Sequence, residues 1–409
     1  MAVGKETFGI MHPVKGFRLG TTRAQVRYSD RRDLVVMEAA AGSSIAGTFT
    51  RNAFCAAPVT LCKNNLATLA GNSDDRLLLV TNTGCANAGT GHQGMQNAQS
   101  VCQTLAELSG VSEANVFPFS TGVIGEPLPV ERIVAGLPAC LSELDENGWG
   151  DAAYGIMTTD TRPKGVSVQL QFGTETVTIS GLSKGAGMIK PNMATMLAYV
   201  ATDAAIEPAL LQRLASEATQ ASFNSITVDS DTSTNDCCML IATGKSGVRF
   251  AENDEALACF KTALMEVYLK LAHAIVRDGE GATKFVAVEV KDAASEEEAR
   301  EVGYTIAHSP LVKTALFASD PNWGRILAAV GRAPIKDLDV DQVAVALNGV
   351  LIAEHGSVAA SYTEEAGSAE MQKEEITITV TLGRGDASAV IWTTDFSYDY
   401  VKINADYRS

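Results

Sequence analysis

The chain has 409 residues, of which 46% are hydrophobic and 20% are charged, and its formal net charge is -16. Such a length and composition predict an ordinary globular protein, built as one large layered domain with an extension or as two lobes. The strongly acidic balance argues against nucleic-acid and anionic-membrane partners, because both bind basic surfaces. The eight scattered cysteines lack any CxxC spacing, which is typical of reduced, mostly buried thiols.

The first ten residues, MAVGKETFGI, contain no apolar stretch after their first charges, so no secretory signal is predicted. No uninterrupted apolar run approaches the length that crosses a bilayer. We therefore expect a soluble cytoplasmic enzyme.

The N-terminal half alternates between strand and helix patterns. A short apolar run at residues 77–80 predicts a buried strand, and residues 96–108 after it have the apolar spacing of a helix. Residues 166–172 and 176–180 each alternate apolar with polar side chains, and Gly173 lies between them. This pattern predicts a hairpin with one solvent-exposed face.

The C-terminal half predicts two further helices and then strands. The first helix is expected from Asp203, as N-cap, to about residue 218, and the second over residues 257–275 with a stop at Asp278 and Gly279. The remaining expectations are a strand at 285–290, a helix capped by Ser295 and Glu298, a solvated loop at 364–375, and a strand pair formed by 376–382 and 389–393. Mixed elements without strict alternation predict a layered α/β fold with antiparallel components.

Thr195 follows Ala194 within residues 190–197, KPNMATML. If the chain is cut between these two residues, the hydroxyl of Thr195 gains its own α-amino group as a base, which is one known solution to nucleophilic catalysis. The glycines at 185 and 187 permit the contorted backbone that such a cut needs. The alternative is a β-branched residue in an apolar segment, because a short motif alone is weak support.

Residues 119–125, FSTGVIG, combine hydroxyl side chains with glycines after an apolar approach. Thr121 and Gly122 there are candidates for an oxyanion hole, which would stabilise a tetrahedral intermediate of acyl transfer; the alternative is a simple glycine turn. Lys184 suits a substrate carboxylate. Glu280, between glycines just past a predicted helix end, suits a cationic substrate group.

Cofactor and metal signals are weak in this chain. Residues 89–94 match GxGxxG, but eight residues separate them from the strand end where a dinucleotide fingerprint needs a tight turn. Residues 229–240 resemble the start of a calcium loop but lack its sixth-position glycine and twelfth-position glutamate. The five histidines have no paired ligand spacing. We predict no cofactor and no metal.

Six segments together resemble one family, the ornithine acetyltransferases, also called glutamate N-acetyltransferases, of cyclic arginine biosynthesis. They occur in the family's order over nearly the whole chain. The segments are 120–125 (STGVIG), 184–197 (KGAGMIKPNMATML), 223–236 (FNSITVDSDTSTND), 278–284 (DGEGATK), 319–325 (SDPNWGR) and 403–409 (INADYRS).

The resemblance implies a chain that cuts itself between Ala194 and Thr195. The fragments 1–194 and 195–409 would stay together in a heterotetramer and would not be independent domains. The implied fold is an α-β-β-α sandwich similar to the N-terminal-nucleophile hydrolases but with different connectivity.

The resemblance also implies a ping-pong acetyl transfer. Thr195 would take the acetyl group from N-acetylornithine and pass it to glutamate, while Thr121 and Gly122 hold the oxyanion. The substrate-binding residues it implies are Thr158, Lys184, Thr195, Glu280, Asn404 and Ser409, where Ser409 replaces the threonine that often ends such chains. Whether acetyl-CoA is also a donor is left open.

Two other functions compete with this interpretation. A self-cut amidohydrolase or aminopeptidase would share the fold and the nucleophile but would pass the acyl group to water. An uncut small-molecule-binding protein would carry no catalysis and would remain one species of 43.0 kDa.

Overall fold

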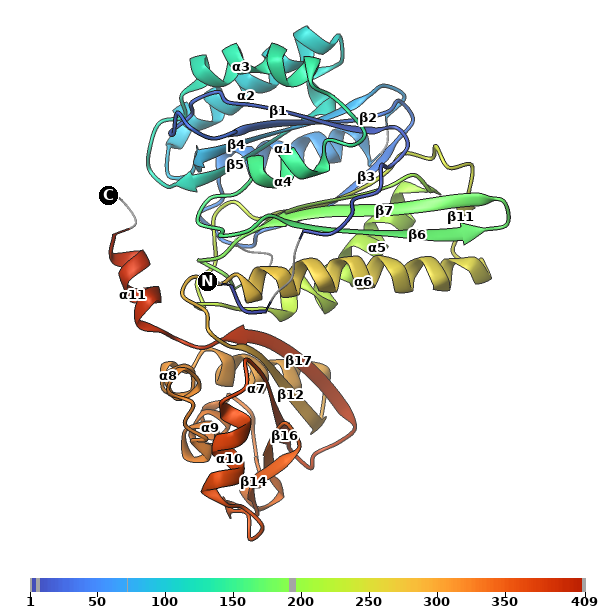
Figure 1. Ribbon diagram of the computed structural model, residues 1–409. Coiled ribbons are helices and arrows are strands. Elements are labelled where there is room, and N and C mark those ends of the chain that lie inside the picture. The colour runs from blue at the N-terminus through green and yellow to red at the C-terminus, as the bar shows by residue number, and fades with distance from the viewer. Residues whose placement is uncertain (1, 5–7, 72, 191–195, 407–409) are drawn as a thin grey trace. The chain divides into compact units, whose positions relative to one another are not determined.

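The computed structural model describes residues 2–4, 8–71, 73–190 and 196–406. The chain forms two compact units, and most of the first is coloured from blue to yellow and most of the second from orange to red in Figure 1. The first, here called the sandwich unit, holds residues 7–224 and 231–275, and the second, the C-terminal unit, holds 1–6, 225–230 and 276–409. The predicted fragments 1–194 and 195–409 stay a prediction.

The first sheet of the sandwich unit contains strands whose side chains alternate between two buried faces. Its order is β1-β2-β4-β5, and only β4 and β5 are parallel. On β2, Val35 and Met37 face one core while Leu34 and Val36 face another, as a two-residue period requires. The strands are β1 (Phe17–Thr22), β2 (Leu34–Ala39), β4 (Leu77–Cys85) and β5 (Val116–Val123).

The second sheet has the order β3-β10-β8-β7-β6, and only β8 and β10 are parallel. The predicted hairpin is confirmed as β6 and β7. The strands are β3 (Ser44–Phe49), β6 (Lys164–Phe172), β7 (Glu175–Lys184), β8 (Leu197–Thr202) and β10 (Cys237–Ala242), and β9 (Ala205–Ile206) pairs separately with β11 (Arg249–Phe250).

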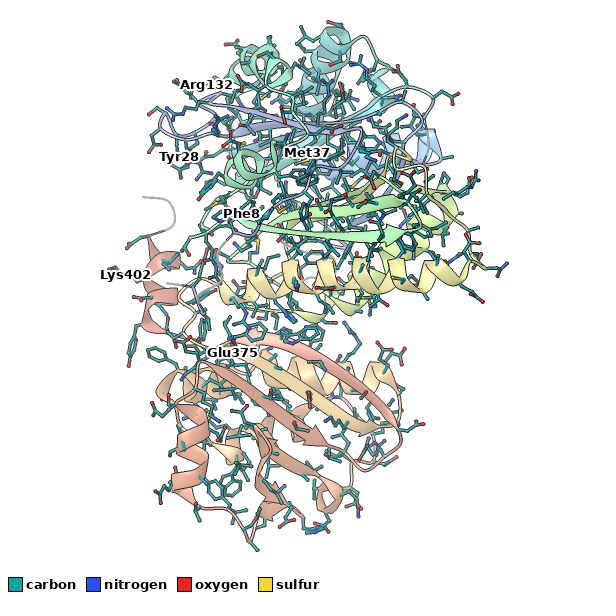
Figure 2. All side chains as sticks on the ribbon, turned by 45° about the vertical axis from the view of Figure 1, so that its right-hand side comes forward. Phe8, Tyr28, Met37, Arg132, Glu375 and Lys402 are labelled. Atoms are coloured by element: carbon teal, nitrogen blue, oxygen red, sulfur yellow. The ribbon has the colours of Figure 1, made fainter. Side chains whose placement is uncertain are left out.

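The two sheets face each other across one core. The Tyr199 ring packs edge-on against Phe119 at 5.1 Å, and its hydroxyl is 2.7 Å from the Thr81 hydroxyl. Figure 2 shows Met37 among the side chains that fill this layer. Trp149 and Cys62, from two helices, complete the same core.

Helices cover the outer faces of both sheets. In Figure 1, α2 and α3 lie over the first sheet, where they form a second core with its outward side chains, and α6 lies along the second sheet, where α5 contacts β3 and β10. The sandwich unit is therefore an α-β-β-α sandwich, and the predicted fold class is confirmed. Its helices are α1 (Ala57–Leu69), α2 (Gly91–Ser109), α3 (Val130–Ser142), α4 (Trp149–Gly155), α5 (Pro208–Ala221) and α6 (Glu255–Arg277).

The C-terminal unit is a six-stranded sheet with helices packed on it. The sheet order is β15-β14-β13-β16-β12-β17. Its strands are β12 (Phe285–Ala293), β13 (Ala344–Leu347), β14 (Val350–Glu354), β15 (Ser357–Val358), β16 (Glu375–Thr381) and β17 (Ala387–Thr394). Its helices are α7 (Glu296–Ala307), α8 (Pro310–Ala318), α9 (Trp323–Arg332), α10 (Glu364–Met371) and α11 (Tyr398–Ala405).

The predicted pairing of residues 376–382 with 389–393 is wrong. Strand β12 lies between β16 and β17, parallel to the first and antiparallel to the second. Val286, Val288 and Val290 of β12 are buried in the core of the unit, so this apolar strand occupies an interior position with a partner at each edge. The connection after β16 crosses the end of β12, where the Arg384 N–H donates to the Asp292 carbonyl at 2.7 Å.

Two helix expectations also differ from the structure. Helix α5 begins at Pro208 rather than after Asp203, because the Asp203 carboxylate accepts the Thr178 N–H at 2.9 Å and so braces two strands. Residues 364–371 form α10, capped by the Thr363 hydroxyl, rather than a loop. The capping of α7 is confirmed, since the Ser295 hydroxyl accepts the Glu298 N–H at 3.2 Å.

Within the described residues, none of the helices has the length and apolar character needed to pass through a bilayer.

Candidate functional site

Thr121 and Gly122 lie near the end of β5, at an irregularity in its parallel pairing with β4. The register shifts between Gly84 and Cys85, so that Cys85 pairs with both Thr121 and Val123. Such bulges bend a strand and redirect its side chains, and they are frequent next to active sites. The candidate oxyanion residues therefore occupy a bulged strand end rather than the simple glycine turn that was the alternative.

Gly122 is required at this bulge by the close approach of two backbones. Its φ is +132°, and a Cβ atom there would lie 2.3 Å from the Gly84 carbonyl carbon and 2.6 Å from the Cys85 nitrogen. Gly84 also has a positive φ, of +102°. No side chain fits at position 122 without moving β4, so the glycine fixes where Thr121 and its hydroxyl stand.

Lys184 connects the second sheet to this strand end. It is the last residue of β7, and its ammonium donates a hydrogen bond to Thr121 Oγ1 at 3.2 Å. Only 5% of Lys184 is exposed. Two of the residues predicted from sequence are thus brought into direct contact by the packing of the two sheets.

Asp160, which the sequence did not single out, bonds to the backbone of Gly185, the residue after Lys184, and to that of Thr158. It lies between α4 and β6, and its side chain is fully buried. Its carboxylate accepts the Thr158 N–H at 3.0 Å, the Gly185 N–H at 2.7 Å and the Lys164 ammonium at 2.6 Å. One carboxylate therefore holds the backbone of Thr158 and the residue that follows Lys184.

The charges around Asp160 keep it ionised. Burial alone would raise its pKa, but the Lys164 and Lys184 ammonium groups and the Gly185 N–H favour the carboxylate, and the pKa is held well below the usual range. Lys164 is itself buried. Asp160 and Lys164 form an ion pair inside the protein, where removal of one partner leaves an uncompensated charge.

A second buried carboxyl group, Asp236, is close enough to Lys184 to feel its charge. It directly precedes β10, and the Cys237 N–H after it donates to the Met196 carbonyl at 3.1 Å. Burial raises the Asp236 pKa well above its usual range, although the Met196 N–H and the Lys184 charge act in the opposite direction. Its Oδ2 atom has no hydrogen-bond partner among the described residues, which is uncommon for a buried polar atom.

Glu280 and Asn404 form a separate group in the C-terminal unit. Glu280 follows α6, as predicted, and it is buried, with its carboxylate accepting the Asn404 side-chain amide at 2.8 Å. A Cβ at Gly281 would lie 2.4 Å from the Tyr400 nitrogen, so this loop packs tightly against α11. The structure thus joins two of the predicted substrate-binding residues, and whether they bind substrate stays a prediction.

The predicted residues Ala194, Thr195 and Ser409 lie outside the described residues. Asp160, Lys164 and Asp236 were missed. Asp236 ends the polar run 229–236 and directly precedes a fully buried strand, which is the signal that sequence reasoning had available for it. Among the described residues, no group of three His, Cys, Asp or Glu side chains is placed to hold a metal ion.

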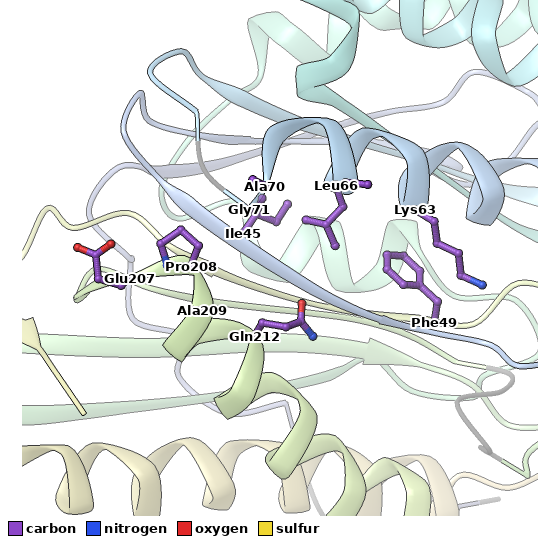
Figure 3. Close-up of a pocket in the computed structure, with 11 residues that line it drawn as sticks. Ile45, Phe49, Lys63, Leu66, Ala70, Gly71, Glu207, Pro208, Ala209 and Gln212 are labelled. Carbon is purple, nitrogen blue, oxygen red and sulfur yellow. The ribbon is translucent and has the colours of Figure 1, made fainter. Parts of the chain in front are cut away.

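A groove elsewhere on the sandwich unit is lined mainly by apolar side chains (Figure 3). It lies between α1 and the start of α5, and Lys63 and Glu207 are the charged residues among its lining. None of the described site residues lines it. It supplies no group for acyl transfer.

The sequence matches the ArgJ family over residues 18–409. It is 57% identical over 412 residues to the "Arginine biosynthesis bifunctional protein ArgJ" of Pseudomonas fluorescens strain Pf0-1, with 100% of both chains covered. The corresponding protein of Pseudomonas syringae pv. tomato strain DC3000 is 55% identical, again with 100% of both chains covered. A solved Mycobacterium tuberculosis ornithine acetyltransferase complexed with ornithine is 31% identical, with a TM-score of 0.36, 44% of this chain covered and 92% of that chain.

A buried threonine hydroxyl beside a glycine-bulged strand end, in an α-β-β-α sandwich, is compatible with an acyl-transfer enzyme. The match over nearly the whole chain is more specific: the chain belongs to the ArgJ family. The resemblance found from six sequence segments is confirmed, and the chain is an acyltransferase of arginine biosynthesis.

The Gly122→Ala substitution tests the close approach at the bulge. We expect it to lower the free energy of unfolding by roughly 2–6 kcal/mol, because overpacking and a left-handed backbone each cost about 1–3 kcal/mol. Urea titration of the unfolding transition measures this. Gly125→Ala is the matched control, since its φ is +84° but no heavy atom lies within 4 Å of an added Cβ; equal losses in the two variants would contradict a backbone clash at position 122.

The Asp160→Asn substitution tests the buried ion pair. At pH 7 we expect a loss of about 3 kcal/mol in the free energy of unfolding, the lower end for breaking such a pair. The folded-state pKa of Asp160 is lowered, so its contribution is complete above the unfolded value of about 4 and shrinks as the pH falls below it. The free energy of unfolding of the wild type should exceed that of Asp160→Asn by less at about pH 3 than at pH 7.

The double variant Asp160→Asn, Lys164→Met is the control for that prediction. It removes both charges, so it should recover part of the loss caused by Asp160→Asn alone. If the difference in free energy of unfolding between wild type and Asp160→Asn does not change with pH, Asp160 is not an ionised group stabilised by its ion pair.

Proposed function

We propose that this chain transfers the acetyl group of N-acetylornithine to glutamate through an acetyl ester on Thr195. The chain first cuts itself between Ala194 and Thr195, which frees the α-amino group of Thr195 as its base. The single observation that supports this most strongly is the buried Thr121 hydroxyl, held by Lys184 at 3.2 Å beside the bulged Gly122. Fixed donors in a water-poor site are what an oxyanion requires.

The transfer proceeds in two half-reactions. The Thr195 oxygen attacks the acetyl carbonyl and gives its proton to the α-amine, and the C–N bond to ornithine breaks as the leaving nitrogen takes that proton. The amine of glutamate then attacks the ester carbon and gives a proton to the α-amine, and the ester C–O bond breaks as the Thr195 oxygen takes that proton. The α-amine suits this task without a large pKa shift, since its ordinary pKa is about 8.

The Thr121 hydroxyl and the Gly122 N–H stabilise the negative oxygen in both half-reactions. Both groups belong to β5, whose end is immobilised by the glycine contact to β4. A donor that is already in place needs no reorganisation when the charge develops, and one such donor accounts for a factor of about 10²–10³ in rate.

Substrate recognition in this proposal uses charged and polar side chains. Glu280 binds the ornithine ammonium, and Lys184, Thr158, Asn404 and Ser409 contribute to substrate binding. Glu280 is buried and bonded to Asn404, so a cation that reaches it meets a carboxylate that is shielded from bulk water. A heterotetramer of the two kinds of fragment, located in the cytoplasm, completes the proposal.

Thr195→Ala should abolish both the cut and the transfer, because it removes the attacking oxygen. A denaturing gel and intact mass follow the cut, and appearance of N-acetylglutamate follows the transfer. Thr195→Ser is the matched control, since it keeps a hydroxyl and should retain both reactions at lower rates. Acetyl transfer by the Thr195→Ala chain, or a single 43.0 kDa species in active wild-type protein, would overturn the mechanism.

An amidohydrolase with the same nucleophile differs only in the group that accepts the acetyl. We expect hydrolysis of N-acetylornithine in the absence of glutamate to be slow beside transfer in its presence, because the ester must be shielded from water for transfer to succeed. Ornithine release with and without glutamate measures both rates. Equal rates would favour the hydrolase.

Acetyl-CoA as a second donor belongs to the same proposal. The Pseudomonas relatives are named bifunctional proteins, which supports a second activity. Glutamate acetylation assayed with acetyl-CoA in place of N-acetylornithine tests it directly.

A further inference from the structure

The hydrogen bond between Lys184 and Thr121 has a fixed direction. An ammonium group has three donors and no acceptor, so in this contact the Thr121 oxygen accepts and Lys184 donates. The hydroxyl proton of Thr121 is then excluded from the side of Lys184 and is directed elsewhere. A hydroxyl whose oxygen accepts from a cation is also a stronger donor, because hydrogen bonds in a chain polarise one another.

Lys184 is therefore in a position to do more than bind a carboxylate. We propose that Lys184 acts through Thr121, by fixing the direction of its hydroxyl proton and strengthening its bond to the oxyanion, and that Asp160 is the positioning residue that holds Lys184 there. This inference rests on the proposed role of Thr121 in the oxyanion hole. It involves no proton transfer, since Lys184 and Thr121 keep their protons throughout.

The burial of Lys184 supports this role. With 5% of the residue exposed, its ammonium is surrounded by protein groups, and the Thr121 oxygen is one of them. The bond from Thr121 to an oxyanion exists fully only in the transition state, so an effect of Lys184 through Thr121 appears in kcat. An effect through a substrate carboxylate would be felt equally in the ground state and would appear in KM.

Asp160 restrains Lys184 in two ways, through a backbone hydrogen bond and through its charge. Its carboxylate accepts the N–H of Gly185, the next residue in the chain, at 2.7 Å, which fixes the backbone from which the Lys184 side chain extends. Its negative charge also attracts the Lys184 ammonium. Gly185 has a φ of +144°, a conformation that other residues rarely adopt and that this hydrogen bond helps to hold.

A double-mutant cycle of Lys184→Met and Thr121→Val tests the connection. We expect Thr121→Val to lower kcat about 10²-fold, as for other oxyanion donors, and Lys184→Met to lower kcat by about tenfold or more with a smaller change in KM. The double variant should be no slower than Thr121→Val alone, because Lys184 has no hydroxyl left to polarise. Rates are expressed per cut molecule, and thermal unfolding confirms that each variant folds.

A donor without its carboxylate separates the two roles of Lys184. With N-acetyl-1,4-diaminobutane, the decarboxylated analogue of N-acetylornithine, single-turnover acetylation of the enzyme should still be slowed by Lys184→Met. A folded Lys184→Met chain that stays uncut would contradict a role of Lys184 confined to the substrate carboxylate, since the cut involves no substrate. The inference is wrong if the Lys184→Met effect disappears with this donor while the chain is cut normally, or if the two substitutions are additive in kcat.

The positioning role of Asp160 is tested by the kcat and KM of its variants. Asp160→Asn should lower kcat with little change in KM, and Asp160→Glu should restore part of the loss, whereas a purely structural role would lower stability and leave kcat per folded molecule unchanged. The proposed function is tested separately, by Thr195→Ala, so its failure can be told apart from failure of this inference. If Thr195→Ala is inactive but the Lys184 and Thr121 effects are additive, only the inference fails.

Discussion

The fully buried carboxylate of Asp160 is the interaction on which the described site depends. It bonds Thr158, Gly185 and Lys164 at once, and through Gly185 it fixes the strand end that carries Lys184. The Lys184 ammonium in turn reaches Thr121 on the opposite sheet. The Thr121 hydroxyl on β5 is thus the last member of a series of polar contacts that begins at Asp160.

The glycine contact between β4 and β5 supplies the second constraint. A side chain at Gly122 would force the strands apart, because a Cβ atom there would lie 2.3 Å from the Gly84 carbonyl carbon. The contact is between backbones, which have no rotamers to change, so it is stiffer than a contact between side chains. The charged groups therefore act on a strand end that is already immobile.

Local patterns predicted the elements that depend on local chemistry. The alternation in β6 and β7 and the Ser295 cap of α7 were read correctly, because each is determined by residues a few positions apart. The order of β16, β12 and β17 was not predicted correctly, because it depends on which strand lies between two others in the sheet. Asp160 was missed for the same reason: its bond to Gly185 spans 25 residues and exists only after β6 and β7 have formed.

The buried pair of Asp160 and Lys164 is better explained by the site than by stability. Replacing a buried ion pair with apolar residues of similar volume is often neutral or stabilising, because the gain from attraction is offset by desolvation of both charges. A pair retained solely to stabilise the fold would have no need to bond Thr158 and Gly185 as well. Lys164 favours the ionised form of Asp160, an ionised Asp160 accepts from both backbone N–H groups, and the bond to Gly185 connects the pair to Lys184 and so to Thr121.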